Sequence, residues 1–273
     1  ILSPTHISLA LYTINPYRGC PLGCVYCYAQ ENKAIKKRNE PWGTFIDVKI
    51  NAIELLEEEI QNKSIDRVLL GSTVECYPPQ EKDFLLTRAI IETLNRHGIA
   101  AVILTKSCLI KRDLALISQH KGNKIYLTVN FDSEDTKKLF EPFSPSIKDR
   151  IDVLKQIQYS NINNRVHIAP VIPYVQDIET IAAMVGDFAQ EISVELYNFR
   201  MGGWKEVERI IKDALPDTIS QKINQLISNK ENYETYIEQT QKIIDKLRKT
   251  MKQKIFLIAP DFKDYYRSDI RYE

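Results

Sequence analysis

The stretch "NPYRGCPLGCVYCYAQ", residues 15–30, places three cysteines within eight positions. Cys20, Cys24 and Cys27 follow the spacing C-x3-C-x2-C. A disulfide needs two cysteines, and a closed structural zinc site needs four ligands. Three thiolates on one short loop can instead bind a metal centre and leave one coordination position open. The stretch therefore predicts a metal centre at which chemistry takes place.

Zinc and iron–sulfur clusters are the two metal centres that this loop suggests. A four-iron cluster normally takes four cysteines, so three would leave one iron with a vacant position that a small molecule can fill. A zinc site would need Cys76, Cys108 or a histidine as its fourth ligand, and neither cysteine has a partner at zinc-finger spacing. Gly19 and Gly23 favour the cluster, because a chain that wraps a cluster needs tight turns. The zinc alternative stays open.

The composition of the chain is that of a globular protein. Its 273 residues are 44% hydrophobic and 27% charged, which suits one large α/β domain or two ordinary ones with a sizeable core. The formal net charge of +1 argues neither for nor against binding of nucleic acid. No apolar run approaches the roughly 20 residues of a membrane span, and no signal segment opens the sequence. Five cysteines, three of them in one loop, do not form a disulfide framework, so we expect a cytoplasmic protein without membrane association.

Short apolar runs alternate with amphipathic segments through the first 200 residues, as in repeated βα units with a parallel sheet. About six such units fall short of the eight of a closed barrel. The sequence therefore predicts an α/β fold, a partial (β/α)6 TIM-like barrel. The expected strands are 8–14, 67–72, 99–107, 123–131, 165–173 and 192–199. The expected helices are 28–38, 51–62, 81–98, 111–120, 144–160 and 177–191.

The last seventy or so residues change in character. Three polar segments, "WKEVERIIKDAL", "DTISQKINQLISN" and "NYETYIEQTQKIIDKLRKTMKQ", predict helices, and "KIFLIAP" at 254–260 predicts one more short strand. No internal repeat and no low-complexity linker separates them from the rest. We therefore predict a partial-barrel core over residues 1–200 and a helical C-terminal extension over 201–273 within the same structural unit.

A C-x3-C-x2-C loop after the first strand of a partial βα barrel resembles the radical SAM superfamily. Further segments resemble its spore photoproduct lyase-like branch: "GSTVECYPPQEKDFLLTRAIIETL" (71–94), "ILTKSCLIKRDLALI" (103–117), "FEPFSPSIKDRIDVLKQI" (140–157) and "IAPVIPYVQD" (168–177). The resemblance implies a [4Fe–4S] cluster with S-adenosylmethionine (SAM) on its fourth iron. It also implies a one-electron reductant of the flavodoxin or ferredoxin type. Reductive cleavage of SAM would then give a 5′-deoxyadenosyl radical that abstracts hydrogen from a substrate.

The same resemblance implies roles for individual residues. Cys20, Cys24 and Cys27 would be the cluster ligands. Tyr26, just before the last cysteine, would pack on the adenine of SAM, and Lys106, just past a strand end, would bind its carboxylate.

A second group of residues follows from position at strand ends. "GSTVEC" stands where the family carries a Gly-Gly-Glu-like segment that meets the SAM amino group, so Gly71, Ser72, Thr73 and Glu75 are candidates. Arg200 ends the last barrel strand and could hold an anionic group of SAM or of the substrate.

Two residues are candidates for hydrogen transfer. Tyr28 follows the last cysteine, where the lyase is suspected of using tyrosines as a relay. The cysteine that donates hydrogen in the lyase falls near Ser72 in this chain, so that donor is replaced. Cys76, four residues on, could stand in or could be a buried small hydrophobe.

The substrate stays open at this level, because function resides in a site and not in a fold. We carry three hypotheses: an enzyme acting on nucleic acid, such as a thymine-dimer repair lyase, an enzyme acting on a small molecule or peptide, and a non-catalytic iron–sulfur or zinc protein. Iron content and SAM cleavage separate the last from the others, and salt-dependent DNA binding separates the first two.

Overall fold

A computed structural model of the chain describes residues 1–200 and 203–260. One eight-stranded sheet runs through it in the order β1-β2-β5-β6-β7-β8-β9-β10. Only β1 is antiparallel to its neighbour, and every other pair in this sheet is parallel. The strands are β1 (Ser3–Pro4), β2 (Tyr12–Ile14), β5 (Arg67–Leu70), β6 (Ala100–Thr105), β7 (Lys124–Thr128), β8 (Asn163–Val171), β9 (Glu191–Leu196) and β10 (Lys254–Ile258). The predicted α/β fold with a parallel, partial-barrel sheet is confirmed.

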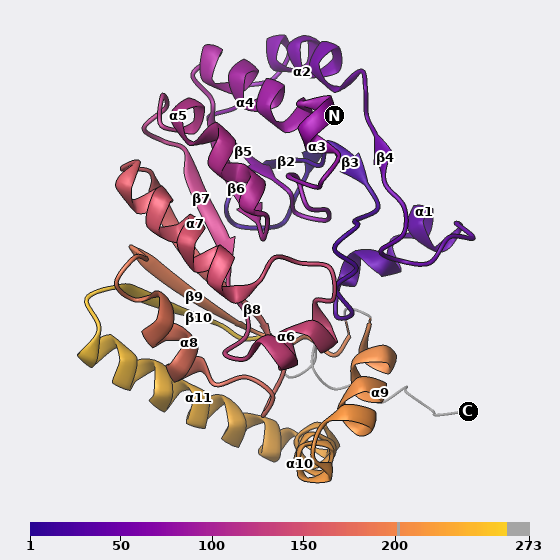
Figure 1. The fold of residues 1–273 in the computed structure, drawn as a ribbon, viewed down its shortest axis with the longest axis vertical. Coiled ribbons are helices and arrows are strands. Elements are labelled where there is room, and N and C mark those ends of the chain that lie inside the picture. The colour runs from indigo at the N-terminus through magenta and orange to yellow at the C-terminus, as the bar shows by residue number, and fades with distance from the viewer. Residues whose placement is uncertain (201–202, 261–273) are drawn as a thin grey trace.

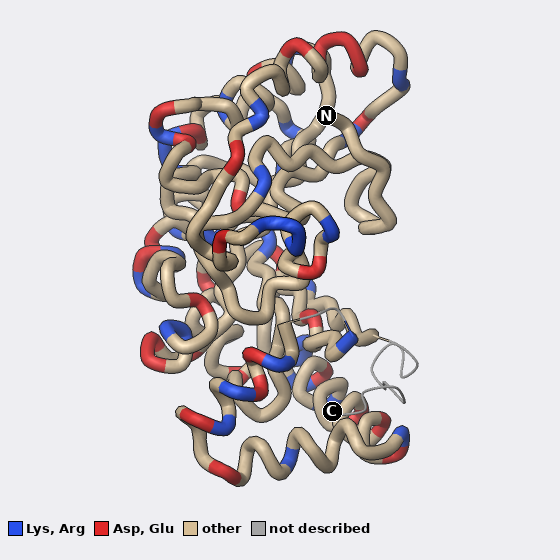
Figure 2. Tube along the Cα trace, turned by 90° about the vertical axis from the view of Figure 1, so that its right-hand side faces the viewer, with Lys and Arg blue, Asp and Glu red and all other residues tan. Residues whose placement is uncertain are grey.

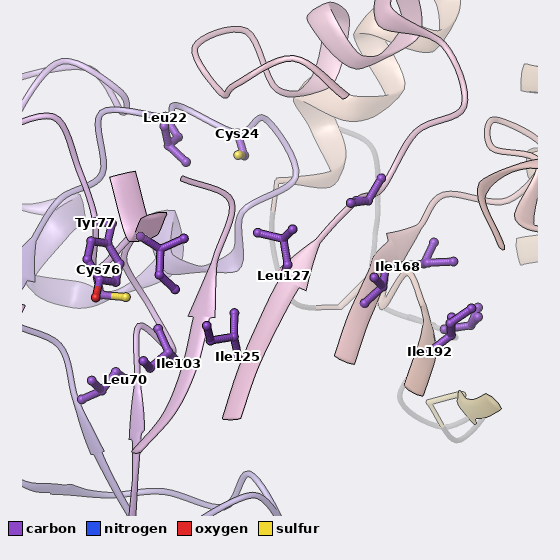
Figure 3. Packing of buried hydrophobic residues seen from close by; sticks show 14 of the residues in the cluster. Leu22, Cys24, Leu70, Cys76, Tyr77, Ile103, Ile125, Leu127, Ile168 and Ile192 are labelled. Atoms are coloured by element: carbon purple, nitrogen blue, oxygen red, sulfur yellow. The ribbon is translucent and has the colours of Figure 1, made fainter. Parts of the chain in front are cut away.

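Helices cover one face of this sheet (Figure 1). Successive residues of a strand point to opposite faces, and those that point to the helices are apolar. Figure 3 shows six of them, Leu70, Ile103, Ile125, Leu127, Ile168 and Ile192, in one continuous core. The covering helices include α2 (Ala52–Gln61), α4 (Leu86–Arg96), α7 (Ile147–Tyr159) and α8 (Ile178–Val185).

The opposite face of the sheet is the open face, and its packing is different. Leu69, Val102 and Tyr126 form a small separate cluster there, and Leu9 and Ala10 of the N-terminal segment pack on it. This packing is why the predicted strand over 8–14 is shorter than expected. The first residues of this segment pack against the open face, and only its last three residues join the sheet.

The cysteine loop lies in a long connection between β2 and β5. A two-stranded antiparallel sheet, which the sequence analysis did not predict, joins the two ends of the segment that carries the loop. The strands β3 (Tyr17–Arg18) and β4 (Asp47–Val48) pair antiparallel and bring the two ends of this segment together. The helix predicted over 28–38 is broken within it into η1 (Tyr28–Glu31) and α1 (Lys33–Lys36). Asn32 causes the break, because its backbone is extended and its side chain accepts the Ala34 N–H at 2.9 Å as a cap.

The C-terminal part is helical, as predicted, and returns to the sheet. α9 (Trp204–Ala214), α10 (Asp217–Ser228) and α11 (Lys230–Thr250) lead to β10, which pairs with β9. The Lys246 Nζ of α11 lies 2.6 Å from the Glu179 carboxylate of α8. The predicted strand at 254–260 therefore extends the barrel sheet. None of the helices in the described ranges is long and apolar enough to span a membrane.

The helix predicted over 81–98 is interrupted. It forms as α3 (Glu81–Phe84) and α4, because Leu85 takes a left-handed conformation with φ of 51°. The fully buried Glu81 carboxylate turns back and accepts the N–H groups of Thr87 at 2.9 Å and Arg88 at 3.2 Å. A side chain of α3 thus caps α4.

The segments on either side of β7 complete the helical layer. The helix predicted over 111–120 forms as η2 (Cys108–Asp113) and α5 (Leu114–Ile117), and α6 (Glu134–Phe140) was not predicted.

We predict that Glu81→Ala destabilises the fold by about 3–5 kcal/mol, because it removes the cap of α4 and leaves Arg112, which lies 2.9 Å from Glu81, without this buried partner. Glu92→Ala is the matched control on α4, since that carboxylate pairs with Arg88 at 3.1 Å while half-exposed. It should cost less than about 1 kcal/mol. Urea unfolding measures both, and equal costs would contradict the capping role.

Candidate functional site

The three cysteines lie on one loop beyond the carboxyl ends of the central strands, where Figure 3 shows Leu22 and Cys24. Sites in βα barrels gather at this end. The loop is a series of tight turns: the Gly23 N–H donates to the Cys20 carbonyl at 3.3 Å, and the Cys27 N–H to the Cys24 carbonyl at 3.2 Å. Cys20 and Cys24 are buried and Cys27 is partly buried. The turns therefore gather three thiols in one protected place.

The protonation of these thiols bears on what the loop can bind. Burial is the largest cause that raises the pKa of Cys20, Cys24 and Cys27 to about 12. A neighbouring thiol of the same loop contributes to each of these shifts. Lys106 acts in the other direction on Cys24 and Cys27. The thiols are thus protonated at neutral pH until a metal replaces the protons, and metal binding must release them.

The donor set fits an iron–sulfur cluster better than a single ion. Within residues 1–200 and 203–260, no three Cys, His, Asp or Glu side chains are arranged to hold one metal ion. A four-iron cluster takes one thiolate per iron, so its thiolates stand farther apart than the ligands of a single ion. Three thiolates contributed by one loop suit a cluster with one free iron position.

The segment between α6 and α7 holds the cysteine loop from outside. The Val25 N–H donates to the Phe140 carbonyl at 2.9 Å, and the Phe143 ring lies so close to Gly23 that a Cβ there would be 3.0 Å from it. The Trp42 indole N–H donates to the Cys24 carbonyl at 3.3 Å. Position 23 favours glycine because its φ is +57° and a Cβ would crowd the Phe143 ring.

A buried carboxylate that the sequence analysis did not single out joins three parts of the site. Glu141 accepts the Tyr26 hydroxyl in a short hydrogen bond, and its Oε1 lies 4.0 Å from the Lys106 Nζ. The Lys106 ammonium also lies 5.8 Å from the centre of the Tyr26 ring. The structure thus brings together the predicted residues Tyr26 and Lys106 through Glu141.

Arg150 completes this group of charges. It is almost fully buried, forms a short ion pair with Glu141 and donates to the Thr128 carbonyl at 3.1 Å. Burial alone raises the pKa of Glu141, but the charges of Arg150 and Lys106 outweigh it and hold the pKa at about 2. Burial likewise lowers the pKa of Lys106, and Glu141 and Cys24 more than reverse this. Two cations and one anion leave a positive charge beside the thiols, which suits an anionic centre.

The Glu75 side chain connects the segment after β5 to the end of β6. Its carboxylate accepts the Tyr77 N–H at 2.8 Å, the Thr105 hydroxyl at 2.6 Å and the Lys106 N–H at 2.9 Å. Burial holds the pKa of Glu75 above its ordinary value despite these bonds. The side chain therefore ties the segment after β5 to the end of β6 and fixes the backbone of Lys106.

Ser72 and Tyr28 meet at the inner edge of the loop. The Tyr28 hydroxyl donates to the Ser72 carbonyl at 2.6 Å. The Ser72 hydroxyl lies 2.8 Å from the Thr13 hydroxyl and accepts the Asn15 amide at 3.0 Å. Asn15 also accepts the Thr73 N–H at 3.0 Å, so it holds the side chain of Ser72 and the backbone of Thr73.

Cys76 lies in the core beneath this edge. It is fully buried, and its Sγ lies 3.4 Å from the Leu104 carbonyl oxygen. Gly71 has φ of +82°, and a Cβ there would lie 2.6 Å from the same oxygen, so the close passage of the two strand ends requires glycine. The thiol thus occupies the place of a small core residue, and its role as a hydrogen donor stays a prediction.

The open face carries a polar group that the sequence analysis did not connect. His167 of β8 lies 2.8 Å from the Ser193 hydroxyl and 3.3 Å from the Glu195 carboxylate, both on β9. The Glu195 side chain is 45% exposed. Its charge contributes, after burial and Cys27, to raising the pKa of Tyr28 to about 12. His167, Ser193 and Glu195 therefore form an acidic, hydrogen-bonding wall on the open face, and its charge acts on Tyr28.

Arg200 follows β9 in the chain. Its backbone N–H donates to the Asn198 side chain at 2.9 Å in the turn after β9. Its role toward SAM or substrate stays a prediction.

The sequence contains different amounts of evidence for the two groups of site residues that the sequence analysis missed. Glu141 and Arg150 lie in "FEPFSPSIKDR", a segment that carries the family resemblance. No spacing pattern in this segment indicates that the two side chains form an ion pair. The group on β8 and β9 could have been found only from strand register, since Thr128, His167 and Ser193 pair across neighbouring strands.

Comparisons with known proteins agree with this geometry. Residues 14–185 match the radical SAM superfamily. The chain is 34% identical to an uncharacterized protein of Methanocaldococcus jannaschii (MJ0683) over 246 residues, which cover 90% of each chain.

Two solved structures show a similar fold. A spore photoproduct lyase mutant gives a TM-score of 0.59 at 14% identity, over 95% of this chain and 79% of that one. Streptococcus suis SuiB bound to its precursor peptide SuiA gives a TM-score of 0.58 at 14% identity, over 90% of this chain and 48% of that one. At these identities the likeness concerns the fold alone.

We predict that Glu141→Gln changes how stability depends on pH. Because the folded-state pKa of Glu141, about 2, lies below its ordinary value of 4.5, its stabilisation is present above the unfolded pKa and is lost as pH falls toward 2. The parent should lose about 3 kcal/mol more than the variant between about pH 5 and pH 2. Denaturant unfolding across this range measures the difference. Glu238→Gln, an exposed carboxyl on α11, is the control, and a variant curve parallel to the parent's would contradict the assignment.

Proposed function

The chain belongs to the radical SAM superfamily, and from this premise we propose that it cleaves SAM reductively and directs the resulting radical at a substrate. The observation that carries the proposal is the loop of Cys20, Cys24 and Cys27 with the Lys106 ammonium held beside it. When bound, the cluster and SAM supply a 5′-deoxyadenosyl radical that can abstract hydrogen.

In this proposal the residues of the chain bind and orient the cofactors. The three cysteines hold the cluster once their protons are released. Lys106 offers a cation for the SAM carboxylate, and Glu141 and Tyr26 keep that cation next to the loop. In this proposal the segment of Gly71, Ser72 and Thr73, in which Asn15 holds the Ser72 hydroxyl and the Thr73 N–H, forms the rim nearest the amino group. The direct contact of Glu75 with SAM and that of Tyr26 with adenine remain predictions.

The substrate side lies on the open face near Tyr28. Glu195 supplies a carboxylate acceptor there, while both ring nitrogens of His167 already have partners in Ser193 and Glu195. The nearest guanidinium on β8, Arg165, is already paired with Glu191 at 2.7 Å. A carboxylate repels phosphodiester groups, whereas it accepts bonds from hydroxyl, amide or amine groups. The wall therefore favours a small molecule or peptide as the substrate.

Thymine-dimer repair is the second candidate, and the fold shared with spore photoproduct lyase is the observation that favours it. Against it stands Ser72 near the position of the lyase's cysteine donor. Cys76 is the nearest thiol that could replace it, and it is buried against the Leu104 carbonyl. We expect poor repair of dimer-containing DNA.

We predict that anaerobic reconstitution loads about four irons and four sulfides per chain. Cys24→Ala should lose most of this iron, because a cluster held by two thiolates is exposed to exchange. Cys108→Ala is the matched control and should retain it, since Cys108 lies outside the loop. Elemental analysis and paramagnetic resonance give the answer. Stoichiometric zinc without iron uptake would support the non-catalytic zinc alternative instead.

We predict that Lys106→Met weakens SAM binding by about tenfold or more while the iron content stays at the parent level. The ammonium is the charge that would pair with the carboxylate of SAM, and such a charged hydrogen bond contributes about 1.5–3 kcal/mol. Equilibrium binding of SAM to the loaded protein measures the effect. Lys82→Met, an exposed lysine on α3, is the control, and equal affinities for Lys106→Met and the parent would remove Lys106 from the SAM site.

A further inference from the structure

Reductive cleavage needs an electron from outside the chain, so a donor must approach the cysteine loop. The inner side of this loop faces Ser72 and the open face of the sheet through Tyr28. The donor must therefore come from the outer side, where Gly23 and Val25 are partly exposed. This inference rests on the proposed function.

An exposed aromatic ring marks the outer side of the loop. Large apolar side chains are usually buried, but Phe143 is 65% exposed. Its ring lies against Gly23 of the cysteine loop. Trp42 lies next to it along the loop, with its indole N–H on the Cys24 carbonyl. The exposed Phe143 ring against this loop, beside the half-buried Trp42, provides an apolar centre for a docking surface.

Basic residues are frequent in the segment that carries the cysteine loop. Residues 18–49, which enclose the cysteine loop, contain six basic and three acidic side chains, whereas the whole chain has a net charge of only +1. Glu31 pairs with Lys36, and Glu40 and Asp47 pair with Arg38. No ion pair among the described residues involves Lys33 or Lys37, and both are exposed. In Figure 1 α1 lies on the right-hand side, which faces the viewer in Figure 2, and Lys and Arg are blue there.

We propose that Phe143 and the basic residues Lys33 and Lys37 form the docking surface for a small acidic one-electron carrier of the flavodoxin type. An apolar centre with an oppositely charged rim suits a weak, fast and reversible contact, as electron-transfer partners need. Charge complementarity selects an acidic carrier and disfavours a basic one. In each encounter one electron passes to the oxidised cluster, and the reduced flavin of the carrier is oxidised by one electron.

The test uses a reduced bacterial flavodoxin as the probe. Flavodoxin binding is measured with the protein before and after cluster loading, and reduction of the loaded cluster is followed spectroscopically. Lys33→Glu/Lys37→Glu should weaken binding and slow reduction by about tenfold or more at low ionic strength. The difference should shrink as salt is added, because exposed charges are screened. Reduction by dithionite should be unchanged, since dithionite needs no docking surface.

Lys242→Glu/Lys249→Glu on α11 is the matched control, with the same charge change on exposed lysines of another part of the fold. It should change flavodoxin binding by less than about twofold. Phe143→Ala, made after its iron content is verified, should weaken binding at low and high salt alike, because the lost contact is apolar.

Equal weakening by the two lysine pairs, or none by Lys33→Glu/Lys37→Glu, would overturn the docking surface. Dithionite-driven SAM cleavage judges the proposed function separately. If it is absent while flavodoxin binding depends on Lys33 and Lys37, the function fails and the docking surface stands.

Discussion

The buried carboxylate of Glu141 is the interaction on which the site depends. One side chain from the end of α6 holds the Tyr26 hydroxyl of the cysteine loop, the Lys106 ammonium at the end of β6 and the Arg150 guanidinium of α7. These segments are far apart in the sequence, and each carries a group that would be costly to bury alone. Removing one partner of such a set leaves uncompensated charge, so the loop and the barrel are fixed together.

A second buried acid has a complementary effect. Glu75 binds the backbone of Lys106, while Glu141 attracts its ammonium. The lysine is therefore fixed at both ends and still keeps 17% of its side chain exposed. A cation that is fixed, charged and reachable can bind an anion without first reorganising, which is a favourable property in a cofactor site. Geometry and charge thus agree with the resemblance that first suggested Lys106.

The chain's own pattern predicts the parts that depend on local chemistry. Thiolate spacing predicts Cys20, Cys24 and Cys27 as ligands, and alternation of apolar runs predicted the parallel sheet and the three C-terminal helices. Residues after a strand end, such as Lys106 and Ser72, were correctly placed at one edge, because parallel strands all end on the same side. These predictions use only the residues that are close to each position in the sequence.

Other features depend on contacts between distant segments, and no local pattern reveals them. The two-residue strands β3 and β4 are too short to show a period, and the break at Leu85 follows from the Glu81 carboxylate turning back on α4. Glu141 and Arg150 read as ordinary charged residues until the fold buries them together. His167 and Glu195 lie on separate strands, and only the register of β8 against β9 makes them neighbours.

The central claim is that this barrel generates a radical from SAM at the three-cysteine loop. Its most direct test is to incubate the loaded, reduced protein with SAM and quantify 5′-deoxyadenosine and methionine, with Cys24→Ala treated in parallel. The account predicts both products in equal amounts from the parent and neither from the variant. A fully loaded parent that binds SAM and forms neither product under reducing conditions would contradict it.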